Sequence, residues 1–190
     1  MELLTPIGRI VQGTPFTFST TNKKGLPLTF KDGSQRKSYW FSLAVKKTNK
    51  LVDRFIDSLV EAAKADYPLH KDIIKFPSEN FSWKIIDGDH KDWCDRDGYA
   101  GCWIFKFGTS FAPQIIDGKT KESLISDQQF KTGDYAQVYV RVAGNGDTDF
   151  KRGNPGIYLN QLAVSKVTDG EPIQQKTDYS SVFDKVDVDL

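Results

Sequence analysis

A chain of 190 residues with 38% hydrophobic and 27% charged residues is long enough to form one domain with a substantial core. Its formal net charge is +1, and it has no apolar run of about 18 residues, so we expect no segment that spans a membrane. The first residues lack the basic region and apolar stretch of a secretory signal, which favours a cytosolic location. In such a reducing compartment we expect Cys94 and Cys102 to be free thiols.

The small net charge hides an asymmetry along the chain. From Asp178 to Leu190 there are four Asp and one Lys, a charge of −3, which leaves +4 for the remainder. Apolar periodicity also ends after Pro172. These patterns predict a folded domain over residues 1–172 and an acidic, disordered tail over residues 173–190.

Strand patterns dominate the first part of the chain. Residues 8–18 are typical of an opening strand, and a turn-rich connection with Lys-Gly and Asp-Gly pairs follows. Residues 37–47 alternate and predict a second strand. Its apolar face is expected in the core and carries Tyr39, Phe41, Leu43 and Val45. Its other face is expected to point outward and carries Trp40, Ser42, Ala44 and Lys46.

One helix is predicted after this strand, over residues 50–68, with Pro68 as its stop. Thr48 or Asn49 can cap its first turn. Apolar residues recur at helical spacing and form one stripe: Leu51, Val52, Phe55, Leu59 and Ala63. We expect this stripe to pack over an open end of a barrel.

Strands and polar loops follow the helix. A short strand at 83–86 leads into an acidic loop that holds Trp93 and Tyr99, and another strand is predicted at 101–108. In that strand Trp103, Phe105 and Phe107 share one face, while Lys106 lies on the other. The pattern leaves open which of the two faces belongs to the core.

Three further strands complete the predicted fold. The segment PQIIDGK begins one, and residues 135–143 form a very clear one, in which valines alternate with Tyr139 and Arg141. A glycine-rich loop with Lys151 and Arg152 leads to the last strand within residues 156–172. The order of strands, one helix and more strands favours a mainly β fold. We expect an OB-fold-like antiparallel barrel of the Greek-key type, with one helix and extra strands and loops.

Few residues support catalysis. His70 and His90 are the only histidines, and neither a G-x-S-x-G nor a Walker-type motif occurs. The acidic loop could hold a divalent cation in a metal-dependent nuclease, because it contains five carboxylates: Asp87, Asp89, Asp92, Asp95 and Asp97. Their spacing is not that of an EF-hand, and Lys91 and Arg96 partly neutralise them. The sequence favours a protein that is not an enzyme and needs no metal or cofactor, with the nuclease as an alternative.

Binding of single-stranded nucleic acid requires cations that follow the phosphates and flat rings that stack on bases, at about 1–3 kcal/mol for each stacked base. Outward aromatic and basic residues recur on three of the predicted strands and in nearby loops. The candidate stacking residues are Trp40, Trp83, Trp93, Tyr99, Trp103 and Tyr139. The candidate phosphate contacts are Arg36, Lys46, Lys106, Arg141, Lys151 and Arg152.

Three stretches carry a resemblance to a known family: GYAGCWIFKFGTSFAPQIIDGK, FKTGDYAQVYVRVAGNG and GNPGIYLNQLAVSKVTDGEP. In this order, over residues 98–172, the chain resembles phage-encoded single-stranded-DNA-binding proteins with an OB-fold and an acidic C-terminal tail. The resemblance implies protection of single strands during phage DNA replication and recombination in the cytoplasm of the infected bacterial host. It implies neither catalysis nor a required metal.

The resemblance also implies a role for the acidic tail, which would meet replication and recombination proteins through Phe183, Asp184, Asp187 and Asp189. The sequence leaves the oligomeric state open, a homodimer included. A structural phage protein whose aromatic residues serve subunit contacts is a further alternative.

Overall fold

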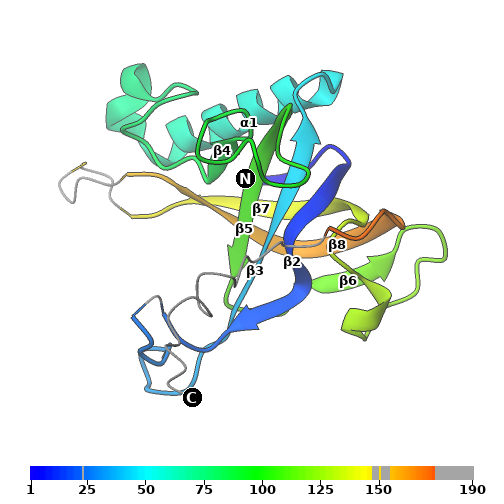
Figure 1. The fold of residues 1–190 in the computed structure, drawn as a ribbon. Helices are drawn as coiled ribbons and strands as arrows, with labels where there is room; N and C mark the ends of the chain where they lie inside the picture. The colour runs from blue at the N-terminus through cyan, green and yellow to red at the C-terminus, as the bar shows by residue number, and fades with distance from the viewer. Residues whose placement is uncertain (23, 147–149, 151–154, 174–190) are drawn as a thin grey trace, which may run out of the picture.

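The structure, a computed structural model, describes residues 1–22, 24–146, 150 and 155–173. Within these residues one sheet of eight strands curls into a barrel, with one long helix across its end (Figure 1). The strands are β1 (Glu2–Leu4), β2 (Gly8–Ser19), β3 (Ser38–Lys46), β4 (Ile85–Asp87), β5 (Cys102–Thr109), β6 (Gln114–Asp117), β7 (Tyr135–Gly144) and β8 (Ile157–Thr168). The helix α1 is Lys50–Asp66, and short 3-10 helices cover Pro68–Ile73 and Asp127–Gln129. The predicted mainly β class with one main helix is confirmed.

The strands follow the order β4-β5-β3-β2-β7-β8-β6, with β1 paired to β7. The sheet curls until its β4 side approaches β8, where Ser82 forms a bridge with Gly156. A Cβ atom on Gly156 would lie 2.5 Å from the Ser82 carbonyl oxygen, so this approach requires glycine. The buried Gln161 adds a second link, because its Nε2 donates a hydrogen bond to the Tyr39 carbonyl oxygen at 3.1 Å. The barrel is therefore partly closed, as the strand pattern predicted.

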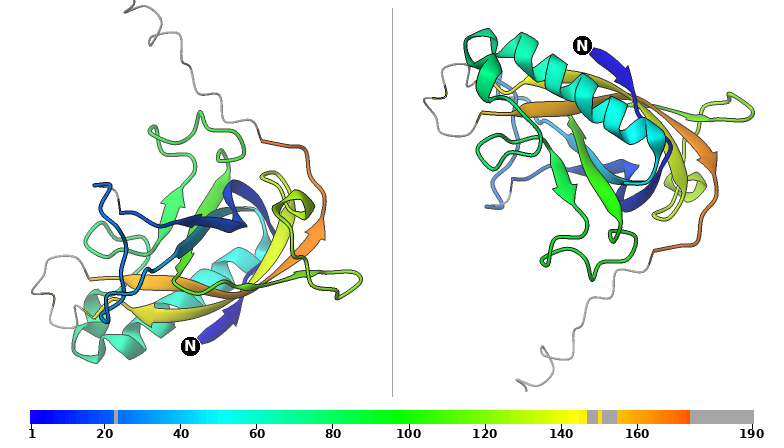
Figure 2. Two further views of the ribbon diagram at one scale, coloured as in Figure 1. Left: turned by 90° about the horizontal axis from the view of Figure 1, so that it is seen from below. Right: turned by 90° about the horizontal axis from the view of Figure 1, so that it is seen from above.

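Helix α1 lies across one end of the barrel, as the view from above in Figure 2 shows. The Asn49 side chain caps it by accepting a hydrogen bond from the Leu51 N–H at 2.9 Å. The helix ends at Asp66, just before Pro68. Its buried stripe contains Val52, Phe55, Ile56, Leu59, Ala62 and Ala63. The prediction that Leu51 belongs to this stripe is wrong, because this residue is 54% exposed on the solvent side of the first turn.

Strand β5 shows which face of residues 101–108 is the core. Phe105 and Phe107 are buried in the main core with the residues of α1, and Trp103 packs against that core from the same face. Phe55 of α1 meets Phe105 edge to face, with 5.3 Å between the ring centres. The aromatic residues on alternate positions of β5 therefore belong to the inner face of the barrel, and Lys106 points outward.

The opposite face of β2, β3 and β5, here called the outer face, is partly covered. A second, smaller core lies on it and contains Val11, Ala44, Tyr99, Cys102 and Ile104. The loop between β4 and β5 supplies Tyr99, and Ile173 packs against this cluster after β8. Ser42 and Ala44 were predicted to point to solvent, but they are only 3% and 4% exposed, and Ala44 is part of this second core. Strand β3 remains accessible toward its two ends, at Trp40 and at Lys46.

Two features of the sheet were not predicted. Strand β1 has only three residues, too few to show an alternating pattern, and β6 pairs with β8 in parallel rather than antiparallel orientation. Cys94 and Cys102 are both free thiols, as expected. No helix in the described part of the chain is long and apolar enough to cross a membrane.

Candidate nucleic-acid interface

Trp40 lies on the outer face, near the start of β3, whereas α1 follows the other end of this strand. Its ring packs on Gly13, which has a positive φ of 65°, and a Cβ atom there would lie 3.1 Å from the ring atom Cζ3. Its cross-strand neighbour on β5 is Gly108, which also has no side chain. The indole N–H donates a hydrogen bond to Ser19 Oγ at 3.2 Å. Gly13 and Gly108 therefore leave room for the partly exposed Trp40 ring on the sheet, and the hydrogen bond to Ser19 fixes its orientation.

Lys106 lies on the same face as Trp40 and diagonally from it, because its partner on β3 is Ser42. Diagonal neighbours in an antiparallel pair are about 7–8 Å apart, within reach of long side chains. The Lys106 Nζ atom is 5.5 Å from the centre of the Trp93 ring, and the Arg96 guanidinium carbon is 4.4 Å from the same centre. The Trp93 ring thus has two cations beside it, and one of them, Lys106, is the diagonal neighbour of Trp40 on the sheet.

The loop that carries Trp93 is anchored by two carboxylates. Asp87 and Asp89 both form ion pairs with Lys47. Asp89 also accepts a hydrogen bond from the Gly101 N–H at 2.6 Å. These hydrogen bonds, first from Lys47 and then from Gly101, hold the pKa of Asp89 below its usual value. The loop is therefore fixed at its start and at its end, and Trp93 is presented from a defined position.

The same ion pairs bear on the nuclease alternative. Asp87 and Asp89 face Lys47, and Asp92 lies 3.5 Å from His90. Among the residues that the structure describes, no group of three or more His, Cys, Asp and Glu side chains is placed to hold a metal ion. The first two carboxylates of the loop are structural, and the arrangement gives no support to metal-dependent cleavage.

Two of the predicted stacking residues are buried. Trp83 is 4% exposed and packs in the main core, 4.5 Å from Phe81 between ring centres. Tyr99 is 3% exposed in the second core, with its ring stacked 6.4 Å from that of Trp93. Neither ring is open to a base in this structure, which corrects the expectation that both are stacking residues. Tyr99 instead belongs to the second core, against which Trp93 packs.

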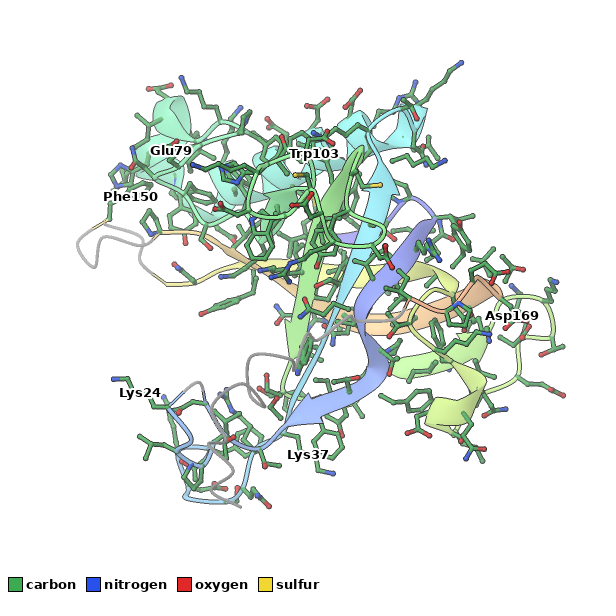
Figure 3. All side chains as sticks on the ribbon, viewed as in Figure 1. Lys24, Lys37, Glu79, Trp103, Phe150 and Asp169 are labelled. Atoms are coloured by element: carbon green, nitrogen blue, oxygen red, sulfur yellow. The ribbon has the colours of Figure 1, made fainter. Side chains whose placement is uncertain are left out.

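Trp103 is half-buried on the inner face, at the α1 end of β5 (Figure 3). Its ring meets Phe76 edge to face at 5.1 Å, and the Lys47 Nζ atom lies 4.5 Å from its centre. It therefore does not share the outer face with Trp40, although both were predicted to stack on bases.

Tyr139 and Arg141 are exposed on β7, but Glu2 of β1 engages both. The Glu2 carboxylate accepts a hydrogen bond from the Tyr139 hydroxyl at 2.6 Å and hydrogen bonds from Arg141 at 2.7 and 3.0 Å. The hydrogen bond from Tyr139 and then that from Arg141 lower the pKa of Glu2, so it stays ionised. Glu2 therefore offsets the charge of Arg141 and also binds the Tyr139 hydroxyl. Glu2 belongs to β1, a strand that the sequence pattern did not reveal.

Arg36 and Lys46 flank β3 at its opposite ends. Arg36 is partly buried and donates a hydrogen bond to Ser110 Oγ at 3.4 Å. Lys46 is exposed and lines a cleft of about 550 Å³ with Arg9 and Tyr135. The covered stretch of β3 separates Lys46 from Trp40, so the outward residues of this strand do not form one continuous stripe.

Sequence reasoning missed an aromatic and basic group at the far end of the β2–β3 hairpin. This hairpin-end group consists of Phe18, Phe30, Lys37 and Phe111. The Lys37 Nζ atom lies 4.3 Å from the centre of the Phe18 ring, and the rings of Phe30 and Phe111 stack at 6.3 Å. Phe111 is 72% exposed. In Figure 3 Lys37 lies at the opposite end of the molecule from Trp103. The available signal was three phenylalanines in or beside turn-rich segments, where no alternation marks them as core.

Six predicted residues lie outside the described part of the chain. They are Lys151, Arg152, Phe183, Asp184, Asp187 and Asp189.

Comparisons with known proteins identify the family and the fold. A family model described as the single-stranded-DNA-binding protein of Enterobacter phage Enc34 matches residues 26–190. The solved structure of the single-stranded DNA-binding protein from bacteriophage Enc34 in complex with single-stranded DNA is similar to this chain. It shares 20% identity and a TM-score of 0.62, over 91% of this chain and 89% of that one. No curated protein matches the chain significantly.

A second solved structure is a single-stranded DNA-binding protein encoded by bacteriophage T7, with 12% identity and a TM-score of 0.57 over 100% of this chain and 97% of that one. Likeness at such identities shows the fold, and it confirms the predicted OB-like barrel. The family model covers β3 and β5, which carry Trp40 and Lys106. The chain therefore belongs to the family of phage single-stranded-DNA-binding proteins represented by that of Enterobacter phage Enc34.

Proposed function

We propose that this chain binds single-stranded DNA with little sequence specificity and without catalysis, through the outer face of β3 and β5 and the loop between β4 and β5. The observation that carries the proposal is the placement of Lys106 beside Trp93 and diagonally from Trp40. Stacking on such rings tolerates any sequence, because every base has a π face. Cations beside the rings bind the phosphates of the same strand.

The proposal assigns a role to the accessible rings and cations of this surface. Trp40 and Trp93 stack on bases, and Lys106 and Arg96 contact phosphates. Lys46 extends the path of the strand toward α1, and the hairpin-end group extends it in the other direction. The paths are supported by exposure and charge: Lys46 is exposed, and the hairpin-end group combines a cation with exposed rings.

Family membership supports a proposal for the biological role. The protein protects single strands during phage DNA replication and recombination in the cytoplasm of the infected host. The body over residues 1–172 binds DNA, and the acidic tail over residues 173–190 contacts replication and recombination proteins. The charge of −3 over residues 178–190, against +4 for residues 1–177, supports a basic body followed by an acidic end. The tail residues proposed for the contact are Phe183, Asp184, Asp187 and Asp189.

The direct test of this function is an electrophoretic shift with oligothymidine and with a duplex of equal length, at several salt concentrations. We expect tight binding of the single strand that weakens with salt, with a slope of about −0.7 for each phosphate contacted. Equal affinity for the duplex would contradict the proposal. Incubation of the same DNA with magnesium or manganese should leave it intact, and cleavage would revive the nuclease alternative.

A further inference from the structure

Strand β4 presents a free edge at the seam of the barrel. The Lys106 N–H donates a hydrogen bond to the Lys84 carbonyl at 2.8 Å, and the Gly88 N–H donates one to the Cys102 carbonyl at 2.9 Å. Residues 84, 86 and 88 are therefore the positions that bond to β5 in this antiparallel pair. The residues between them, 85 and 87, direct their peptide groups away from β5.

Only one of these two residues keeps both of its peptide groups available. The Asp87 carbonyl accepts a hydrogen bond from the His90 N–H at 3.2 Å. For Ile85, neither the N–H nor the carbonyl has a hydrogen-bond partner among the residues that the structure describes. Ile85 thus offers one donor and one acceptor, side by side, on the free edge.

A cleft of about 400 Å³ runs along this edge. Its lining includes Lys84 and Ile86 from the outer side of β4 and Ile85 from the inner side, which places it at the edge itself. Trp103 and Phe76 form an aromatic wall, with 5.1 Å between their ring centres. The volume falls in the range of about 300–1,000 Å³ that is common for small-ligand pockets.

The cleft is continuous with the proposed DNA interface. Lys106 lines it and also lies over the Trp93 ring on the outer face. A second cation, Lys84, lines the cleft and lies 5.6 Å from the centre of the exposed Tyr158 ring. A strand held on the outer face by Lys106 therefore passes close to a pocket whose lining combines two aromatic rings, set edge to face, with a free peptide edge.

We propose that this edge cleft holds one unpaired nucleobase of the bound strand. The Ile85 N–H and carbonyl hydrogen-bond to the Watson–Crick edge of the base, while Trp103 and Phe76 pack on its ring. Splayed-out bases are recognised in this way by other proteins, through stacking and through their Watson–Crick edges. A base in a duplex has that edge occupied and is excluded, so the cleft discriminates single strands from duplex. The inference rests on the proposed function and locates one subsite of it.

The geometry favours a base over a peptide strand that extends the sheet. Strand addition needs a row of free N–H and carbonyl groups along the edge. Strand β4 has three residues, and only Ile85 offers both groups. One donor and one acceptor beside an aromatic wall match a single flat ring.

The test measures amide hydrogen exchange at Ile85 in the full chain, with and without saturating oligothymidine. We expect exchange at Ile85 to slow on the order of ten-fold with oligothymidine, because a hydrogen-bonded amide exchanges only after opening. An oligonucleotide of N3-methylthymidine keeps its rings and phosphates but lacks the Watson–Crick donor and is blocked at that edge. It should bind on the outer face yet leave Ile85 exchange unchanged.

Two variants add a measurement that does not depend on exchange. Phe76→Leu keeps an apolar side chain but removes one ring of the wall, and we expect it to weaken oligothymidine binding at least about five-fold. Leu69→Ala is the matched control, since Leu69 is 83% exposed on the neighbouring 3-10 helix and should leave affinity unchanged.

The outcomes separate this inference from the proposed function. Absence of any single-strand binding by the native chain would remove both. Salt-dependent binding with unchanged Ile85 exchange would overturn the edge cleft alone. Slower Ile85 exchange that follows protein concentration without DNA would also overturn it, because it would show the edge pairing with a second copy of the chain.

Discussion

The Lys106 ammonium group lies 5.5 Å from the centre of the Trp93 ring, although Lys106 belongs to strand β5 and Trp93 to the loop before it. The contact joins strand β5 of the barrel to the β4–β5 loop that packs over the outer face. It places a phosphate-binding cation next to a flat ring, and the ion pairs of Lys47 keep the loop in place. This relationship leads to the first prediction.

Replacing Lys106 by Gln should weaken oligothymidine binding and reduce the salt slope by about 0.7, the value for one lost phosphate contact on a single strand. Binding at several salt concentrations measures both quantities. Lys64→Gln is the matched control, because Lys64 pairs with Glu61 on α1, away from the outer face. An unchanged slope for Lys106→Gln would show that this cation does not touch the phosphates.

Removing the acid that engages Tyr139 and Arg141 tests whether β7 contacts DNA. Glu2→Gln takes away one negative charge and releases the Arg141 guanidinium. We expect oligothymidine affinity to stay within about two-fold of the native value, because the proposed path follows β3 and β5. A clear rise in affinity would place β7 in the interface.

The anchoring of the β4–β5 loop predicts a pH dependence of stability. Hydrogen bonds from Lys47 and Gly101 lower the folded-state pKa of Asp89 below its ordinary value of 3.8. The stabilisation is therefore fully present above pH 3.8 and is lost as the pH falls through the folded-state pKa. Thermal unfolding followed from neutral to acidic pH should show this loss, and Lys47→Gln should reduce it. The same acid dependence in Lys47→Gln would contradict the assignment.

Adjacent residues of β5 should differ sharply in their effect on stability. Phe105→Ala removes a fully buried ring and should cost about 3–5 kcal/mol in the free energy of unfolding. Lys106 is exposed, so Lys106→Gln should change the free energy of unfolding by less than about 0.5 kcal/mol. Denaturant unfolding of both variants checks the register, and similar losses would mean that the two faces of β5 are assigned incorrectly.

The fold could be predicted because alternation and helical spacing are local signals. Residues 37–47 and 135–143 alternate over their full length, and the structure has β3 and β7 there. The three residues of β1 carry no such signal, and the parallel pairing of β6 with β8 depends on contacts between segments far apart in the chain.

The site was less predictable, because exposure depends on what covers a strand. Alternation correctly separated Trp40 from Phe41, but it could not show that Tyr99 and Ile173 cover Ala44. Likewise, the pattern of β7 places Tyr139 outward and says nothing of Glu2, which reaches it from the other end of the sequence. A residue's face follows from its strand, whereas its neighbours follow from the whole fold.

The most direct measurement of the central claim is tryptophan fluorescence during titration with oligothymidine, for the native chain and for Trp40→Ala. Stacking of bases on the outer face predicts strong quenching that Trp40→Ala reduces. The variant should also bind about 5- to 150-fold more weakly, the equivalent of about 1–3 kcal/mol for one stacked base. Quenching and affinity that are the same in the native chain and in a correctly folded Trp40→Ala variant would contradict the account.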